Sequence, residues 1–242
     1  MRYFQYLLFN SSFKELFYND FNNSKRIIIS TLNPHSFVVA EKDYTFKKAL
    51  LNADFLLVDG VGIKIILLIQ FKYVKLFNGP YLHSQIISNF RKIKIKVFYM
   101  GSSELVLNRI VDKLKIEAPL WVVETYSPPF TNVFSKDQND IIINNINKFK
   151  PDILFIGMTA PKQEKWVDIN KNNLDAKYII SIGAVFDFYS DVKKSAPKLI
   201  VKLNLIWAYR LLTDFKHVWR RTFISFPLFL YLNVIKSIKF IR

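Results

Sequence analysis

The chain of 242 residues contains no cysteine and only three histidines, His35, His83 and His217. The absence of cysteine excludes a disulfide scaffold, a zinc site with cysteine ligands and a thiol nucleophile. The wide spacing of the histidines argues against a histidine-rich metal site. With 51% hydrophobic and 16% aromatic residues, the chain is also too apolar to be intrinsically disordered. Its length suits one large domain, or one domain with an appendage.

A long apolar run is missing as well. The best candidate, residues 222–235, has 14 residues with Pro227 and Asn233 among them, whereas a membrane span needs about 20 apolar residues. The amino-terminal segment lacks a convincing signal-peptide hydrophobic region and a small-residue cleavage site. These absences predict a cytoplasmic protein.

Acidic residues are scarce, with 19 Asp and Glu against 35 Lys and Arg, a formal net charge of +16. The excess is uneven: residues 192–242 contain eleven Lys or Arg and a single acid, Asp214, a net charge of +10. Compositional drift of an AT-rich coding sequence explains a high total, but it does not concentrate charge in this way. The basic excess predicts an anionic partner: nucleic acid, an anionic membrane surface or a phosphorylated substrate.

Short runs of β-branched and aromatic residues alternate with longer stretches of helical spacing, which predicts an α/β fold with a mainly parallel sheet. Strands are expected at residues 26–30, 55–58, 96–100, 121–125, 152–158 and 178–182. Helices are expected at residues 37–52, 104–114 and 136–149. After Asp191 long amphipathic stretches replace the strands. We therefore expect an α/β core over residues 1–191 and a helical, basic appendage over residues 192–242.

Ligands of open α/β sheets bind at the carboxyl ends of the strands. Thr31 and Asn33 follow the first strand and face the same side of an extended segment, although turn and capping chemistry also accounts for them. Asp59 follows the second strand, with Gly60 and Gly62 behind it. This pattern is typical of a general base beside backbone that approaches a ligand, or of a carboxylate that caps the next helix.

Three further strand ends carry candidate residues. Gly101 and Ser102 form either a phosphate cradle at a helix start or a tight capped turn. Lys162 and Gln163, in the first turn after Pro161, are placed to hold an anion and a polar sugar. Asp187 interrupts an apolar run, so it needs a function or a structural ion pair with a nearby lysine.

In order, the blocks are T-x-N-x-H, A-D-x-x-L-x-D-G-x-G, P-D-I-L-F-I-G-M-T-A-P-K-Q-E-K-W, I-G-A-V-F-D-F, A-P and W-x-Y-R-L. Together they resemble the WecG/TagA/CpsF family of bacterial glycosyltransferases, over residues 31–221. The resemblance implies a Rossmann-like α/β fold. It also implies transfer of an N-acetylmannosamine-type sugar or another hexose from a UDP-sugar to a polyprenyl-diphosphate-linked sugar. That reaction is inverting, needs no metal or other cofactor, and serves teichoic acid, capsule or exopolysaccharide synthesis on the inner face of the cell membrane.

The resemblance also implies roles for individual residues. Asp59 matches the proposed general base, and Thr31, Asn33 and Gln163 match polar residues of the same pocket. Three arginines match basic residues that the appendage brings to the diphosphate, where they take the place of a metal. These are Arg210, Arg220 and Arg221.

Two departures from the family pattern leave an inactive member as an alternative. Leu76 and Tyr81 stand where the family usually has arginine and aspartate, and Lys75 is a candidate replacement for the missing cation. The second departure is Asp214-Phe215-Lys216-His217, where the family usually has E-P-x-R.

A basic nucleic-acid-binding module is favoured by charge alone, but the sequence has no recognition motif for it. The third alternative, a dinucleotide oxidoreductase, lacks G-x-G-x-x-G after the first strand. The oligomeric state stays open.

The appendage is rich in aromatic and aliphatic residues beside its basic ones, which predicts peripheral docking at an anionic membrane surface. Burial of these residues against the core is the alternative. They are Phe223, Phe226, Leu228, Phe229, Leu230 and Tyr231.

Overall fold

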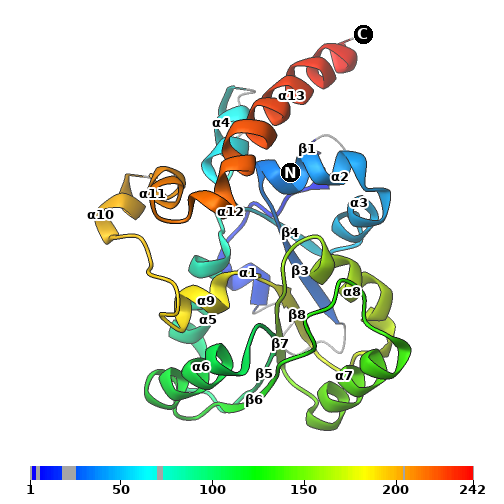
Figure 1. The fold of residues 1–242 in the computed structure, drawn as a ribbon, viewed down its shortest axis with the longest axis vertical. Coiled ribbons are helices and arrows are strands. Elements are labelled where there is room, and N and C mark those ends of the chain that lie inside the picture. The colour runs from blue at the N-terminus through cyan, green and yellow to red at the C-terminus, as the bar shows by residue number, and fades with distance from the viewer. Residues whose placement is uncertain (1, 4–5, 18–25, 70–72, 204, 242) are drawn as a thin grey trace.

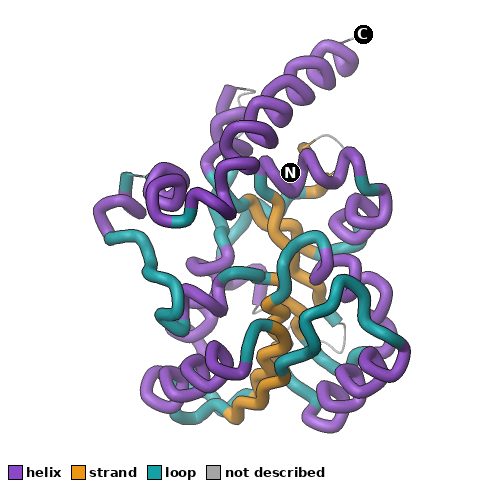
Figure 2. Tube along the Cα trace, viewed as in Figure 1, coloured by secondary structure: helices purple, strands orange, loops and turns teal. Residues whose placement is uncertain are grey.

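A six-stranded, all-parallel β-sheet runs through the middle of the protein, with helices on both faces (Figure 1, Figure 2). The computed structural model describes residues 2–3, 6–17, 26–69, 73–203 and 205–241. The strand order is β4-β3-β8-β7-β5-β6. The strands are β3 (Ile27–Leu32), β4 (Phe55–Val58), β5 (Lys96–Gly101), β6 (Val122–Tyr126), β7 (Ile153–Gly157) and β8 (Tyr178–Ser181). The six strands expected from the sequence and the α/β fold class are confirmed.

Consecutive strand side chains enter apolar clusters on opposite faces of the sheet, because side chains alternate along a strand. Ile153 and Phe155 of β7 join one cluster, whereas Leu154 and Ile156 join another, and all four are fully buried. Burial on both faces explains why these strands have uninterrupted apolar sequences. The first cluster includes side chains of α5 (Gly79–Phe90) and α6 (Glu104–Glu117), and the second includes those of α7 (Lys136–Phe149) and α8 (Lys162–Asn170).

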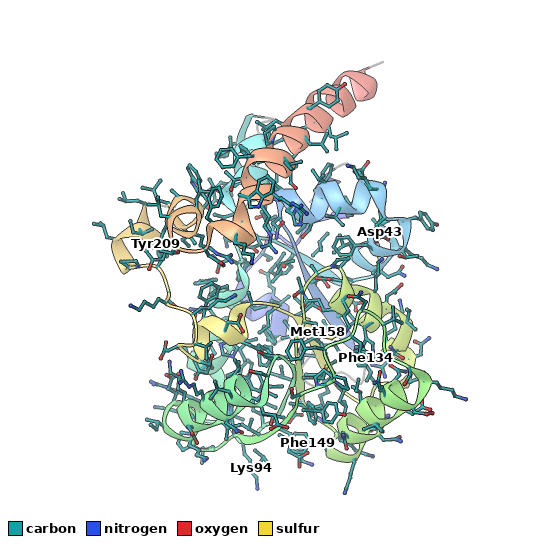
Figure 3. All side chains as sticks on the ribbon, viewed as in Figure 1. Asp43, Lys94, Phe134, Phe149, Met158 and Tyr209 are labelled. Atoms are coloured by element: carbon teal, nitrogen blue, oxygen red, sulfur yellow. The ribbon has the colours of Figure 1, made fainter. Side chains whose placement is uncertain are left out.

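The single helix expected at residues 37–52 is wrong, because the chain forms two helices that meet at Asp43 (Figure 3). Asp43 accepts hydrogen bonds from the backbone nitrogen of Phe46 at 3.0 Å and from the hydroxyl of Thr45 at 2.7 Å, so it starts a new helix. Its carboxylate also pairs with Lys165 of α8. The two helices are α2 (Pro34–Lys42) and α3 (Tyr44–Leu51). The remaining elements before residue 192 are β1 (Arg2–Tyr3), β2 (Tyr6–Leu7), α1 (Phe13–Phe17), α4 (Val61–Ile69), the 3-10 helix η1 (Lys171–Asn173) and α9 (Val185–Tyr189).

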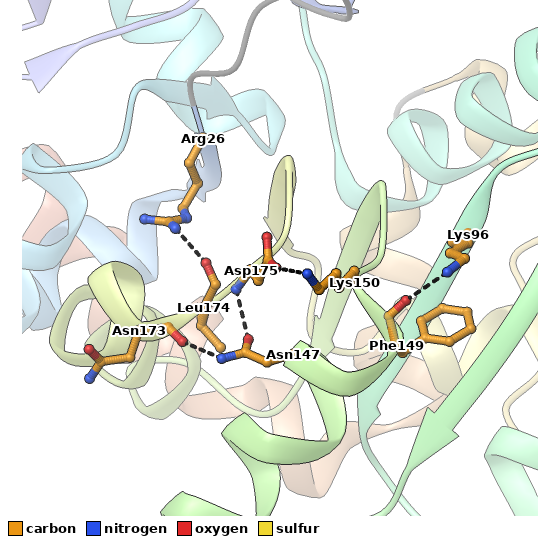
Figure 4. Close-up of polar contacts among 8 residues, drawn as sticks. All are labelled: Arg26, Lys96, Asn147, Phe149, Lys150, Asn173, Leu174 and Asp175. Atoms are coloured by element: carbon orange, nitrogen blue, oxygen red, sulfur yellow. Dashed lines mark hydrogen bonds and ion pairs between the residues drawn. The ribbon is translucent and has the colours of Figure 1, made fainter.

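At the amino ends of the strands, polar groups hold neighbouring loops together (Figure 4). The side chain of Asn147 donates to the carbonyl of Asn173 at 2.7 Å and accepts from the backbone nitrogen of Asp175 at 2.7 Å. Lys150 pairs with Asp175 at 3.5 Å. A cavity of about 190 Å³ lies here, and its charged groups include pairs of opposite sign. It is lined by Arg26, Lys150, Pro151, Asp152, Asp175, Ala176 and Lys177. These basic residues therefore have structural partners.

The carboxyl-terminal part is helical, as expected, and its helices begin at Lys198 (Figure 1). Its last helix, α13, extends beyond the sheet. The elements are α10 (Lys198–Lys202), α11 (Ile206–Thr213), α12 (Phe215–Arg220), the π-helix η2 (Arg221–Ser225) and α13 (Phe226–Ile241). No helix of the described residues combines the length and the apolar character needed to cross a membrane.

Over residues 226–233 of α13, one face packs on the α/β part and the other faces solvent. Phe229 is fully buried, and its ring meets that of Phe37 edge-on at 5.4 Å between centroids. Phe226 and Leu228 are partly buried in the same cluster. The expected aromatic surface is therefore wrong for Phe229. Its exposed members are Phe223, Leu230 and Tyr231, and Ile224 adds to them.

Phe229 and Tyr231 allow a matched test of this packing. Phe229→Ala is expected to lower the free energy of unfolding by about 3 to 5 kcal/mol, because it removes a fully buried ring and leaves a cavity. Tyr231 lies two residues away and is 62% exposed. Tyr231→Ala is therefore expected to change the free energy of unfolding by less than about 0.5 kcal/mol. Urea denaturation of both variants measures the difference. Equal effects would contradict the inward orientation of Phe229.

Candidate functional site

The pairing of β3 with β4 brings Asp59 beside Asn33 at the carboxyl edge of the sheet. Leu32 and Val58 are register partners, and the backbone nitrogen of Asp59 donates to the carbonyl of Leu32 at 2.9 Å. Oδ1 of Asn33 accepts from the backbone nitrogen of Ser36 at 2.9 Å and caps α2. The Asn33 side chain also hydrogen-bonds Asp59, and the amide nitrogen is the group that can donate to a carboxylate. Asn33 therefore serves both as helix cap and as partner of Asp59.

Two arginines of the carboxyl-terminal helices lie near this carboxylate. Arg210 of α11 pairs with Asp214 at 3.7 Å and lies over the ring of Phe188 at 5.2 Å. Arg221 begins the π-helix η2, and its charge and that of Arg210 both act on Asp59. Arg220, the third expected cation, is exposed and lies over the ring of Trp219 at 5.3 Å. The structure thus brings two of the three expected arginines to Asp59.

The environment of Asp59 suits a proton acceptor. Burial raises the pKa of its carboxyl above the ordinary value, while Arg210, the Asn33 hydrogen bond and Arg221 pull it down. A carboxylate whose charged form is partly desolvated is a stronger base than one in water. Thr31, one residue before the end of β3, is partly exposed near this position. Thr31, Asn33 and Asp59 therefore gather at one edge, as expected.

The two glycines after Asp59 differ in their surroundings. Gly60 has φ of +92°, a conformation that side-chain-bearing residues rarely adopt, and it turns the chain from β4 towards α4. A Cβ at Gly62 would lie 2.7 Å from Pro34 and 2.8 Å from Phe226. Close packing of α4 against α2 and α13 therefore explains Gly62, in place of the expected approach to a substrate.

A second group lies farther along the sheet, where β5 and α9 meet. Gly101 has φ of +123°, and a Cβ there would lie 2.5 Å from the carbonyl of Gly157. Ser102 donates to Asp187 at 3.4 Å, and Lys193 pairs with the same carboxylate at 3.1 Å. The alternative of a structural ion pair for Asp187 is therefore confirmed. Gly101 is explained by close contact between strands.

Lys162 and Gln163 are neighbours in the first turn of α8, but their side chains make different contacts. Lys162 donates to the carbonyl of Thr131 at 2.5 Å, and its ammonium lies 3.8 Å from the ring centre of Phe134. Phe134 packs in the cluster of Met158 (Figure 3), so Lys162 is held against the loop before α7. Gln163 is buried, and a Cβ at Gly183 would lie 3.6 Å from its amide. The structure thus buries Gln163 beside Gly183 and directs Lys162 elsewhere.

Glu164 lies next to Gln163 in the first turn of α8. It is only 3% exposed, and it accepts a hydrogen bond from the amide nitrogen of Gln163 at 2.8 Å. Burial is the main cause that raises the pKa of its carboxyl to about 7. A glutamate in the first turn of a helix ordinarily faces solvent and complements the helix dipole. Its burial could therefore not be predicted from the residue type and its place in the helix.

The two residues of the first departure from the family pattern, Leu76 and Tyr81, have packing roles. Leu76 lies partly buried against the cluster that contains Phe229, and Tyr81 packs edge-on against Phe77 with centroids 5.5 Å apart. Lys75 is exposed. The described cations beside Asp59 therefore come from the carboxyl-terminal helices.

Glu164→Gln is expected to stabilise the protein more at pH 8 than at pH 5. The folded-state pKa is raised from 4.5 to about 7, so stability is lost as pH rises from the unfolded pKa to the folded one. The free energy of unfolding of the variant relative to wild type should grow by about 2 kcal/mol between these pH values. Denaturant titrations at both pH values measure it. Glu124→Gln, at an exposed carboxylate of β6, controls for loss of charge, and an equal gain at both pH values would contradict burial of a charged Glu164.

Comparison with known proteins identifies relatives that match most of the chain. An N-acetylglucosaminyldiphosphoundecaprenol N-acetyl-β-D-mannosaminyltransferase of Staphylococcus aureus strain NCTC 8325 is 26% identical over 223 residues, 90% of this chain and 83% of that protein. The protein of the same name from strain MRSA252 is 36% identical over 94 residues, 39% of this chain and 36% of that protein. The family described as glycosyl transferase WecG/TagA/CpsF matches residues 8–242. With the carboxylate, amide and arginines gathered at one sheet edge, this match shows that the chain belongs to the WecG/TagA/CpsF family of glycosyltransferases.

Proposed function

We propose that the protein transfers a hexose, of N-acetylmannosamine type or similar, from a UDP-sugar to a polyprenyl-diphosphate-linked sugar. The names of the two Staphylococcus aureus relatives support a diphosphate-linked polyprenyl acceptor and an N-acetylmannosaminyl donor. The observation that carries the proposal is the partly buried carboxyl of Asp59, held by Asn33 and flanked by Arg210 and Arg221. This combination provides a base and positive charge in one place.

The proposed reaction is a single displacement with inversion. Asp59 takes the proton of the acceptor hydroxyl as that oxygen bonds to the anomeric carbon of the donor sugar. The bond from the anomeric carbon to the UDP oxygen breaks on the opposite face, and UDP leaves with the electron pair. Arg210 and Arg221 stabilise the negative charge of the diphosphate, so the mechanism requires no metal ion. Thr31 and Gln163 hold polar groups of the sugars.

Asp59→Asn tests the base. We expect its kcat to fall by about 10² to 10⁴ with folding unchanged, because an amide cannot accept the proton. The full chain is incubated with UDP-sugars and polyprenyl-diphosphate sugars in the presence of EDTA, and product masses identify the disaccharide lipid. Asp175→Asn, which alters an ion-paired carboxylate at the opposite edge of the sheet, is the matched control. Unchanged turnover of Asp59→Asn would remove the base from the mechanism.

We further propose that the carboxyl-terminal helices dock on the anionic inner surface of the cell membrane. The solvent-facing stripe of η2 and α13 consists of apolar positions, with basic residues before it. Phe223, Ile224 and Tyr231 are 58%, 52% and 62% exposed. Lys216 and Arg220 are exposed just before it. Apolar side chains flanked by cations are the pattern of interfacial helices.

The double variant Phe223→Ser, Tyr231→Ser tests this docking without truncation. Each buried aromatic side chain contributes about 1.5 to 3 kcal/mol, so we expect binding to phosphatidylglycerol vesicles to weaken at least about tenfold. Vesicle sedimentation measures it. Ile116→Ser with Phe130→Ser removes two apolar residues that are 84% and 85% exposed elsewhere on the protein, and should bind like wild type. Equal loss in both double variants would contradict a specific docking surface.

A further inference from the structure

One hydrogen bond joins the two parts of the protein next to the site. Nδ1 of His35, in the first turn of α2, lies 2.8 Å from the hydroxyl of Ser225, at the end of the π-helix η2. Ser225 is only 6% exposed. Burial, and then the charge of Arg221, lower the pKa of His35 to about 4, so the ring is neutral near neutral pH. A neutral imidazole and a hydroxyl can share this bond through a single proton.

The bond connects the chain segments that carry the site residues. His35 follows Asn33 by two residues, and Ser225 follows Arg221 by four. The nearby contacts between the same two parts are apolar: Phe226 lies against Gly62, and Phe229 against Phe37. Apolar contacts hold surfaces together but are not directional, whereas a hydrogen bond has a defined geometry. The His35–Ser225 bond can therefore fix the rotation of η2 about its axis.

The five residues from Arg221 to Ser225 also have an unusual helix geometry. The backbone nitrogen of Phe226 donates to the carbonyl of Arg221, which closes one wide turn that begins at Arg221 and ends at Ser225. Single wide turns inside α-helices are rare in proteins. Those that do occur are often found at functional sites. A change of this turn would rotate Arg221 relative to the helices on either side.

We propose that His35 and Ser225 are positioning residues for glycosyl transfer, because their hydrogen bond holds the wide turn in the rotation that directs Arg221 towards Asp59. This inference rests on the proposed function. Neither side chain is assigned a contact with substrate. They act through Arg221, whose charge reaches both Asp59 and His35.

Ser225→Ala tests the inference. Loss of one neutral hydrogen bond corresponds to about 1 kcal/mol, so we expect kcat to fall about fivefold with KM for the donor changed less than twofold. Thr222→Ala is the matched control, because Thr222 lies in the same π-helix as Ser225 but its hydroxyl donates to the preceding helix α12, to the carbonyl of Val218 at 3.2 Å. Full activity is expected for the control. Equal kcat for both variants would overturn the positioning role.

Two further comparisons separate positioning from a general structural effect. His35→Leu should lower kcat like Ser225→Ala, whereas His35→Asn should retain more activity, because its amide can reach the position of Nδ1. In an Arg221→Ala background, Ser225→Ala should cause no further loss, since both changes act through one group. Independent, multiplying losses in that background would overturn the inference.

Hydrogen exchange gives a readout that needs no turnover. The amides of residues 221–226 should exchange faster in Ser225→Ala than in Thr222→Ala if the bond holds the wide turn. Unchanged exchange in both would overturn the inference even in an active enzyme. Turnover of the wild-type protein tests the proposed function separately, so the two failures are distinguishable.

Discussion

The parallel pairing of β3 with β4 is the constraint on which the site depends. The bond from the backbone nitrogen of Asp59 to the carbonyl of Leu32 continues the ladder one residue beyond β4. It places Asp59 beside Asn33 before any side chain has contributed. Asn33 is fixed in turn by capping α2, so a group needed for helix stability also orients the carboxylate. A shift of one residue in this register would move Asp59 to the other face of the sheet.

The carboxyl-terminal helices complete the site from the outside. Without them Asp59 would lack its two arginines, and the charge of the carboxylate would be harder to maintain in a partly buried position. Their attachment is mainly apolar, through Phe229 and Phe226. Apolar packing supplies the stability of this contact, and polar bonds such as that of His35 with Ser225 supply its orientation. The outward residues of the same helices stay available for a membrane surface.

Most of the fold could be predicted from the sequence, because a strand buried on both faces has a continuous apolar sequence that is easily recognised. The break between α2 and α3 could not, because apolar residues continue at helical spacing across it and only the capping geometry of Asp43 reveals it. The proximity of Thr31, Asn33 and Asp59 could be predicted, because these residues lie at the carboxyl ends of two predicted strands. The direction of Lys162 did not, since the ring of Phe134 that holds it lies 28 residues earlier in the chain.

At some positions one residue can have both a structural and a functional role, whereas at others the structural role excludes the functional one. Asn33 caps a helix with its oxygen, and its amide nitrogen remains free to donate to Asp59, whose pKa Asn33 lowers, because an amide has both an acceptor and donors. Gly62 has no such freedom: the space that a side chain would occupy is filled by Pro34 and Phe226. The number of free bonding groups that remain after the structural role is satisfied therefore decides which residues of a motif can also take part in the chemistry.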